Sequence, residues 1–169
     1  MYELLKKYNI QTVYHFTEQA NLKSIKEQRG IFSLKLLKEK CISDISYISN
    51  NWSQDADRYK NLDSYVHLCF VKGQHPMAYH AILQDKSIIW LEIDISILNK
   101  TGVLYTNDVS NKAGVKLLDE TKARTDLDIE AINSFLPFDK PNNKNRKIAT
   151  YKYEILIPDC VPLNYIRNI

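Results

Sequence analysis

The stretch from Val13 to Ser33 constrains the fold of this chain more than any other, because a strand pattern runs directly into a helix pattern. Residues 12–16 alternate as a short strand does, and residues 18–28 carry Ala20, Leu22 and Ile25 at helical spacing. Gly30 follows where helices commonly end on a glycine. The sequence therefore predicts a strand, a helix and a sharp stop within the first 30 or so residues.

Three polar side chains fall at this transition from strand to helix, namely His15, Thr17 and Asn21. They supply an imidazole, a hydroxyl and an amide. Backbone N–H groups at the start of a helix attract anions such as phosphate, so this arrangement suits a small polar ligand. The alternative is that the same residues only cap the helix.

The order of the remaining patterns indicates an α+β fold rather than a repeated βαβ plan, because helices cluster early while strands dominate the middle and end. No repeat or linker divides the 169 residues, so we expect a single domain over residues 1–169. Residues 41–62 and 137–147 are polar, without a clear period, and are expected to be irregular. The predicted strands are 65–71, 87–93, 103–106 and 149–157, and the predicted helices are 2–8, 33–39, 78–84, 112–119 and 128–135.

Composition excludes several classes of protein. Apolar and charged fractions of 44% and 25% are those of an ordinary globular chain. Glu92 and Asp94 interrupt the longest apolar run, so we expect no membrane span, and the N-terminus lacks a secretory signal, so we expect the cytoplasm. Cys41, Cys69 and Cys160 are too far apart for a zinc motif, and we expect no metal.

Glu154 is notable because it interrupts an otherwise apolar strand pattern. Strand alternation places Glu154 and Leu156 on one face, so the carboxylate lies at the rim of a cleft or has a partner. The alternative is an exposed glutamate on an edge strand. His67 is expected to be a packed strand histidine, and His75 and His80 are expected at the surface or in turns.

These segments, in this order, resemble the DarT family over nearly the whole chain, from about Val13 to Ile166. DarT proteins are toxins of toxin–antitoxin systems that ADP-ribosylate nucleobases of single-stranded DNA, using NAD. The resemblance implies an ADP-ribosyltransferase-like fold, with two small packed β-sheets around an NAD cleft. The segments that carry it are His15-Phe16-Thr17, Asn21-Leu22, Gly30-Ile31-Phe32-Ser33, Tyr65 to Phe70, Pro76-Met77 to Tyr79, Val103 to Thr106, and Glu154 to Pro158.

The resemblance also implies roles for individual residues. Glu154 matches the catalytic glutamate, and Arg58 resembles an arginine that contacts NAD and supports catalysis. Further positions match the family's NAD-binding residues, with the last two on the nicotinamide side: His15, Thr17, Asn21, Tyr65 and Met77.

Elementary chemistry is consistent with these roles. Cleavage of the nicotinamide–ribose bond passes through a transition state like an oxocarbenium ion. Glu154 can grip a ribose hydroxyl and oppose the positive charge that develops on C1′. Arg58 can pair with the pyrophosphate through its planar guanidinium. We further expect His15 to donate a ring N–H to a ribose.

The acceptor is expected to be single-stranded DNA, modified on thymine or guanine, between which the sequence does not decide. Arg146, Lys147 and Tyr151 flank the predicted catalytic strand and are candidate DNA-binding residues, the alternative being a solvated charge run. We also expect a monomer that is neutralised by an antitoxin, a macrodomain-type ADP-ribosyl hydrolase.

Two other functions compete with this hypothesis. The first is the same NAD chemistry on RNA or protein, and the second is a catalytically silent nucleic-acid-binding module. Such a module needs phosphate contacts rather than a carboxylate such as Glu154, which would repel the backbone. A metal-dependent nuclease is disfavoured, although Asp55, Asp57 and Asp63 lie close together in sequence.

Overall fold

A computed structural model describes residues 1–49 and 51–169, without the side chains of residues 51 and 52. Its helices are α1 Tyr2–Lys7, α2 Leu22–Glu27, α3 Leu34–Glu39, α4 Asn51–Tyr59, α5 Pro76–Ile82, α6 Glu120–Asp126, α7 Ile129–Asn133 and α8 Asn143–Thr150. Its strands are β1 Thr12–Glu18, β2 Gly30–Phe32, β3 Tyr65–Cys69, β4 Ile88–Asp94, β5 Leu104–Thr106, β6 Glu154–Pro158 and β7 Cys160–Pro162. Short 3₁₀ segments are η1 Gln19–Asn21, η2 Leu62–Ser64, η3 Ile95–Asn99 and η4 Leu163–Tyr165.

In the described part of the chain, the strands form a five-stranded sheet of order β4-β1-β3-β6-β5 and a two-stranded sheet of β2 and β7. All of the strand pairs are antiparallel. This is the α+β architecture with two sheets that the sequence predicts. Strand β6 lies between β3 and β5, so both of its edges are hydrogen-bonded.

The core explains why these strands form. Ile155, Leu156 and Ile157 have no exposed surface, and Val13 and Ile93 are equally buried on the neighbouring pair β1 and β4. A run of consecutive apolar residues is typical of a strand that is covered on both faces. Truncating any one of these side chains to alanine would cost about 2–5 kcal/mol. Strand β6 is therefore a rigid base for the residue that begins it, Glu154.

The small sheet depends on Gly30, although not for the reason that the sequence suggested. Gly30 begins β2 instead of ending the preceding helix, and the residue with left-handed backbone is Arg29, at φ 58°. A Cβ atom at position 30 would lie 2.7 Å from the carbonyl oxygen of Val161 on β7. Glycine is needed here because the two backbones approach so closely.

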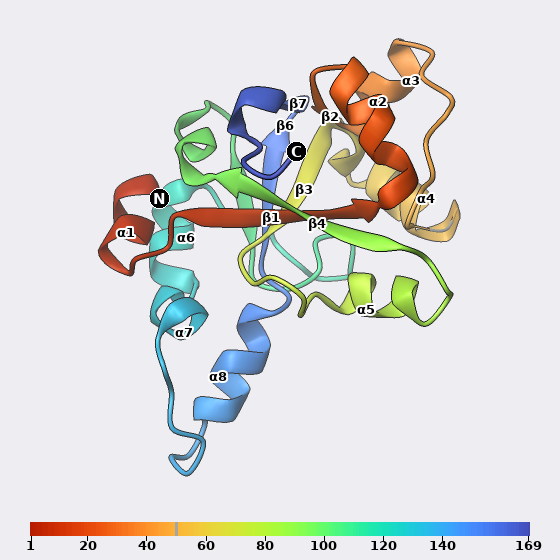
Figure 1. Cartoon of the computed structure of the whole chain (residues 1–169). Helices are drawn as coiled ribbons and strands as arrows, with labels where there is room; N and C mark the ends of the chain where they lie inside the picture. The colour runs from red at the N-terminus through yellow and green to blue at the C-terminus, as the bar shows by residue number, and fades with distance from the viewer. Residues whose placement is uncertain (50) are drawn as a thin grey trace.

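The helices lie at both ends of the large sheet (Figure 1). Helices α2, α3 and α4 gather beyond the end of β1, whereas α6, α7 and α8 lie on the other side of the molecule. The polar stretch 41–62, predicted to be irregular, contains α4, and the stretch 137–147 contains the start of α8. The predicted helix over 112–119 is absent from these described residues, which form turns and a bridge to β5 instead.

Candidate active site

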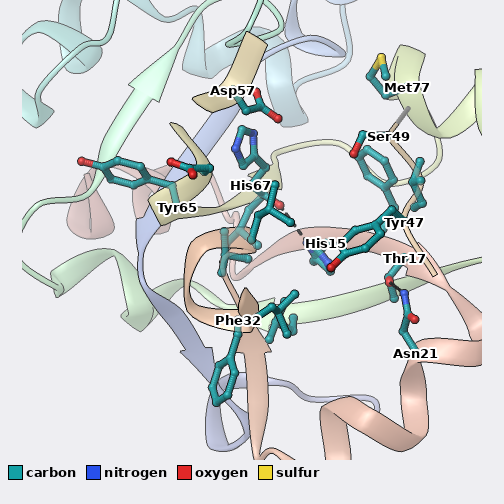
Figure 2. Close-up of a pocket in the computed structure, with 18 of the residues that line it drawn as sticks. His15, Thr17, Asn21, Phe32, Tyr47, Ser49, Asp57, Tyr65, His67 and Met77 are labelled. Atoms are coloured by element: carbon teal, nitrogen blue, oxygen red, sulfur yellow. Dashed lines mark hydrogen bonds between the residues drawn. The ribbon is translucent and has the colours of Figure 1, made fainter. Parts of the chain in front are cut away.

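A cavity of about 240 Å³ opens between β1, β3 and the helices at the end of β1 (Figure 2). Segments far apart in sequence form its walls, including β2, residues 45–49 and residues 109–111. Its apolar side is formed by Phe16, Ile31, Phe32, Leu34 and Leu37. The predicted site residues that line it are His15, Thr17, Asn21, Tyr65, Met77 and Glu154.

His15 and Thr17 reach the cavity together because side chains two residues apart on a strand share a face. The Nδ1 atom of His15 lies 2.9 Å from the carbonyl oxygen of His67, which only a protonated Nδ1 can satisfy. Burial lowers the pKa of His15 to about 4, so the ring is neutral. Its Nε2 is therefore a hydrogen-bond acceptor. The expected direction of the ribose contact is reversed, because the ring N–H is already used.

Asn21 holds a wall of the cavity in place. Its side-chain NH₂ donates to Thr17 Oγ1 at 2.9 Å and to the carbonyl of Ser46 at 2.8 Å, and its oxygen accepts from the Ser46 N–H. The amide is 5% exposed. Asn21 thus fastens the segment 45–49 to β1, and its polar atoms are committed to the protein.

Glu154 is buried at the base of the cavity, 5% exposed, and is not an edge-strand glutamate in water. Its Oε2 accepts the backbone N–H of Ser110 at 3.2 Å and lies 3.3 Å from His67 Nδ1. Its Oε1 lies 3.0 Å from His75 Nε2. Burial alone would raise the pKa of the carboxyl group, but the contacts with His67 and His75 hold it well below its usual range. The carboxylate is therefore ionised at neutral pH.

The two histidines beside Glu154 correct the sequence predictions. His75 is 1% exposed instead of lying at the surface, and His67 lines the cavity instead of being merely packed in its strand. A local signal existed for His75, because it directly precedes Pro76, and a residue before a proline at the first helical position is a helix N-cap. His80 is exposed, as expected.

His67 faces hydrogen-bond acceptors with both ring nitrogens, Glu154 on one side and the carbonyl oxygen of Leu62, 3.4 Å away, on the other. Burial lowers its pKa, but the bond to Glu154 and the negative charges of Glu154 and Asp57 outweigh burial and raise it to about 9. Asp57 lies beside His67 in the cavity wall (Figure 2), and burial raises the pKa of its carboxyl group. The cavity thus contains an imidazolium between two carboxyl groups.

Tyr65 and Met77 both line the cavity, on opposite sides of it. In Figure 2 the Tyr65 ring extends away from His15 and Thr17, while Met77 lies at the far end beyond Ser49. Tyr65 therefore lies at the margin of the cavity.

The structure does not bring Arg58 into the cavity. Arg58 is absent from the described lining residues, and its guanidinium lies 2.5 Å from the exposed carboxylate of Asp55, one turn earlier on α4. The helix presents Asp57 and Ser53 to the cavity instead. Trp52, on the same helix, lies outside the residues whose side chains are described.

The candidate DNA-binding residues also lie elsewhere, on α8 and just after it. Arg146 pairs with Asp128 and Glu130, both at 2.6 Å, and Lys147 donates to two backbone carbonyls of α7. Tyr151 follows the same helix, and none of the three is among the described lining residues. The two cations fasten α8 to α7, so their charges are already paired or capped.

The described residues contain no group of three or more His, Cys, Asp or Glu side chains placed to hold a metal ion, and the acids near Asp57 do not form such a group. None of the helices among them is long and apolar enough to cross a bilayer.

Solved structures of DarT proteins have the same architecture. Thermus sp. 2.9 DarT in complex with ADP-ribosylated ssDNA matches with TM-score 0.68 and 18% identity, over 94% of this chain and 79% of that chain. Thermus sp. 2.9 DarT in complex with NAD+ matches with TM-score 0.63 and 19% identity, over 94% and 80%. Thermosipho africanus DarTG in complex with ADP-ribose matches with TM-score 0.69 and 19% identity, over 92% of this chain but 42% of that one. The fold is that of these DarT structures.

The family model of ssDNA thymidine ADP-ribosyltransferase, DarT, matches residues 14–169. The chain therefore belongs to the DarT family, which confirms the resemblance read from the sequence. Its family name specifies thymidine, where the sequence alone left thymine and guanine open. The comparison with curated proteins gives no match.

Proposed function

We propose that this protein transfers ADP-ribose from NAD to a thymine base of single-stranded DNA, and that Glu154 is the catalytic residue. One observation carries the proposal: the buried Glu154 carboxylate is ionised and lines the same cavity as His15 and Thr17. Charge that is desolvated and fixed before the reaction stabilises a cationic transition state far better than charge in water.

The residues present fit NAD. The free Nε2 of His15 accepts a hydrogen bond from a ribose hydroxyl, and the Thr17 hydroxyl, which accepts from Asn21, still has its own proton to donate. The apolar wall around Phe32 and Leu37 suits the ring systems of a dinucleotide. NAD supplies the ADP-ribosyl group and leaves as nicotinamide.

Glu154 acts on the ribose carbon where the bond changes. Its charge stabilises the oxocarbenium-like state while the glycosidic bond to nicotinamide breaks and a bond to the thymine base forms. The base loses a proton in this exchange. The ionised carboxylate is the acceptor for that proton, directly or through water.

Arg58 stays a prediction, and its role would require α4 to release the guanidinium from Asp55. We also infer that residues 1–169 form a single domain, since one cluster of buried apolar residues runs from Met1 to Ile166. The DNA contacts of Arg146, Lys147 and Tyr151 also stay a prediction.

The biological setting follows from the family. We propose that the protein is a monomeric toxin in the cytoplasm, bound or counteracted by an antitoxin that removes ADP-ribose through a macrodomain. The support is the match to Thermosipho africanus DarTG, a chain more than twice as long as the matched part.

The test combines the protein with NAD and single-stranded oligonucleotides that are identical except for one position, occupied in turn by each base. Mass spectrometry should show one added ADP-ribose only where thymine is present. The E154Q variant should give none. An increment on RNA or protein but not on DNA would retain the chemistry and overturn the target. Absence of nicotinamide release with every acceptor would overturn the enzymatic assignment and leave the binding module.

A further inference from the structure

We infer that His75 is a positioning residue for the reaction, which holds the Glu154 carboxylate in the orientation that the ribose requires. This inference rests on the proposed role of Glu154. The observation behind it is that a buried imidazole, 1% exposed, faces a buried carboxylate, 5% exposed, across 3.0 Å.

The protein backbone fixes which nitrogen of His75 carries the proton. His75 is the N-cap of α5, and its Nδ1 accepts the backbone N–H of Met77 at 3.3 Å. A nitrogen that accepts cannot carry the ring proton, so a neutral His75 has it on Nε2, the atom beside Glu154 Oε1. The N–H does not point straight at the oxygen, so the contact is short but bent. A helix cap thereby sets the tautomer of a residue that contacts the catalytic group.

Both oxygens of Glu154 are engaged, from three different parts of the chain. Oε1 faces His75, while Oε2 faces His67 on β3 and accepts the N–H of Ser110. With both oxygens held, the carboxylate plane cannot rotate about its last bond. His67 also contributes charge, and both histidines line the cavity, but the His67 side chain is 31% exposed whereas that of His75 is 2% exposed. His75 is therefore the contact whose function is easier to separate from substrate binding.

Asp57, on α4, adds negative charge near the carboxylate and so favours its protonation. Cys69, the partner of Glu154 across β3 and β6, is a thiol whose pKa burial raises, so it is uncharged and adds no such effect. Of the neighbours from these packed elements, His67 and His75 oppose that effect. Removing the His75 contact should therefore make the carboxylate easier to protonate as well as freer to rotate.

Two substitutions at one position separate the cap from the contact. In H75N the side-chain oxygen can still accept the Met77 N–H, since asparagine is a strong N-cap, but the shorter side chain cannot reach Glu154. In H75Q the amide nitrogen lies about where Nε2 did, so the donor returns while the cap weakens. A purely structural His75 would thus tolerate asparagine better, whereas a positioning residue would tolerate glutamine better.

We expect H75N to lower kcat by about 10–100-fold, the range seen when an outer partner of a functional group is removed, with the KM for NAD changed by less than about threefold. The acidic limb of its kcat–pH profile should move up by about one pH unit. H75Q should recover most of kcat and the original limb. Circular dichroism and thermal unfolding of both variants establish that each is folded.

The outcomes separate the role of His75 from the proposed role of Glu154 on which it rests. If E154Q is inactive but H75N matches the wild type in kcat and in its acidic limb, or H75Q is the worse of the two, the role of His75 is wrong and that of Glu154 stands. If E154Q retains activity, the proposed function fails first. A loss confined to the KM for NAD would make His75 a binding residue and would also overturn the inference.

Discussion

Two clusters of charge in this molecule contrast with each other, one around Glu154 and one between α7 and α8. In the first, a carboxylate 5% exposed meets two histidines at the base of a cavity. In the second, Arg146 joins Asp128 and Glu130 at the surface. Sequence reasoning assigned a function to both, and the structure places only the first beside a cavity.

The contrast shows that the number of ion-pair partners of a charged side chain is a poor guide to function, whereas its burial in a cavity is a better one. Arg146 has excellent geometry, yet water already screens its charge, and such pairs contribute little to stability. Glu154 is ionised although it is only 5% exposed, an arrangement that is costly unless its partners remain. A protein rarely keeps such a group without a use, and a strongly shifted pKa in a cavity is a functional signal.

The largest effect is expected at Glu154. E154Q keeps the shape of the side chain but removes the charge that opposes the developing cation, so ADP-ribosylation should fall by about 10³-fold or more. Initial rates with a thymine-containing oligonucleotide measure it. Glu92, on β4, provides the matched control, because it pairs with Lys72 and is not among the described residues that line the cavity. E92Q should retain wild-type rates. Equal losses in the two variants would contradict the assignment.

A smaller effect is expected when the cavity wall is released. N21A removes two hydrogen bonds to residue 46, both at 2.8 Å, and one to Thr17 at 2.9 Å, and leaves buried partners unsatisfied. We expect the KM for NAD to rise about tenfold and unfolding to become about 1–3 kcal/mol easier. Asn133 donates a single bond to the carbonyl of Tyr8 on the other side of the molecule, so N133A should leave that KM unchanged.

The pH dependence of stability tests the charge states of His67 and His15. The pKa of His67 rises from 6.5 to about 9 on folding, so its contribution is complete below pH 6.5 and disappears as pH rises through 9. The pKa of His15 falls from 6.5 to about 4, so the unfolded chain takes up the proton first, and stability drops as pH falls from 6.5 to 4.

Denaturant unfolding of the wild type, H67Q and H15Q across this range provides the measurement. The difference between wild type and H67Q should shrink between pH 6.5 and 9, and that between wild type and H15Q should change only below pH 6.5. Parallel curves for the wild type and H67Q would show that folding does not raise the pKa of His67.

Strands β1, β3, β4 and β6 were predictable because the residues that they bury form local apolar patterns in the sequence. The special position of Glu154 was predictable for the opposite reason, since a charge inside such a pattern needs an explanation. His67 was missed because its partner lies 87 residues away. Antiparallel pairing of Cys69 with Glu154 puts His67 diagonally across on the same face, so knowledge of the register would have found it.

Helices α6 and α8 were missed for different physical reasons. The start of α6 had a readable signal, because Asp119 caps it by accepting the N–H of Lys122. Helix α8 has few apolar residues with a clear period, and its place is set by the contacts of Arg146 and Lys147 with α7. Such tertiary contacts cannot be read from a local window, so the same two cations looked free to bind DNA.

The smallest effect is therefore expected at Arg146. This substitution tests whether α8 contacts DNA. If its guanidinium serves only α7, R146A should keep the rate and the KM for the oligonucleotide within about twofold, and the salt dependence of binding should not change, because no phosphate contact is lost. K147A and Y151A test the other two candidate DNA-binding residues by the same measurements. A salt-dependence slope reduced by about one in R146A would instead show a phosphate contact, and would mean that α8 leaves α7 to meet the strand.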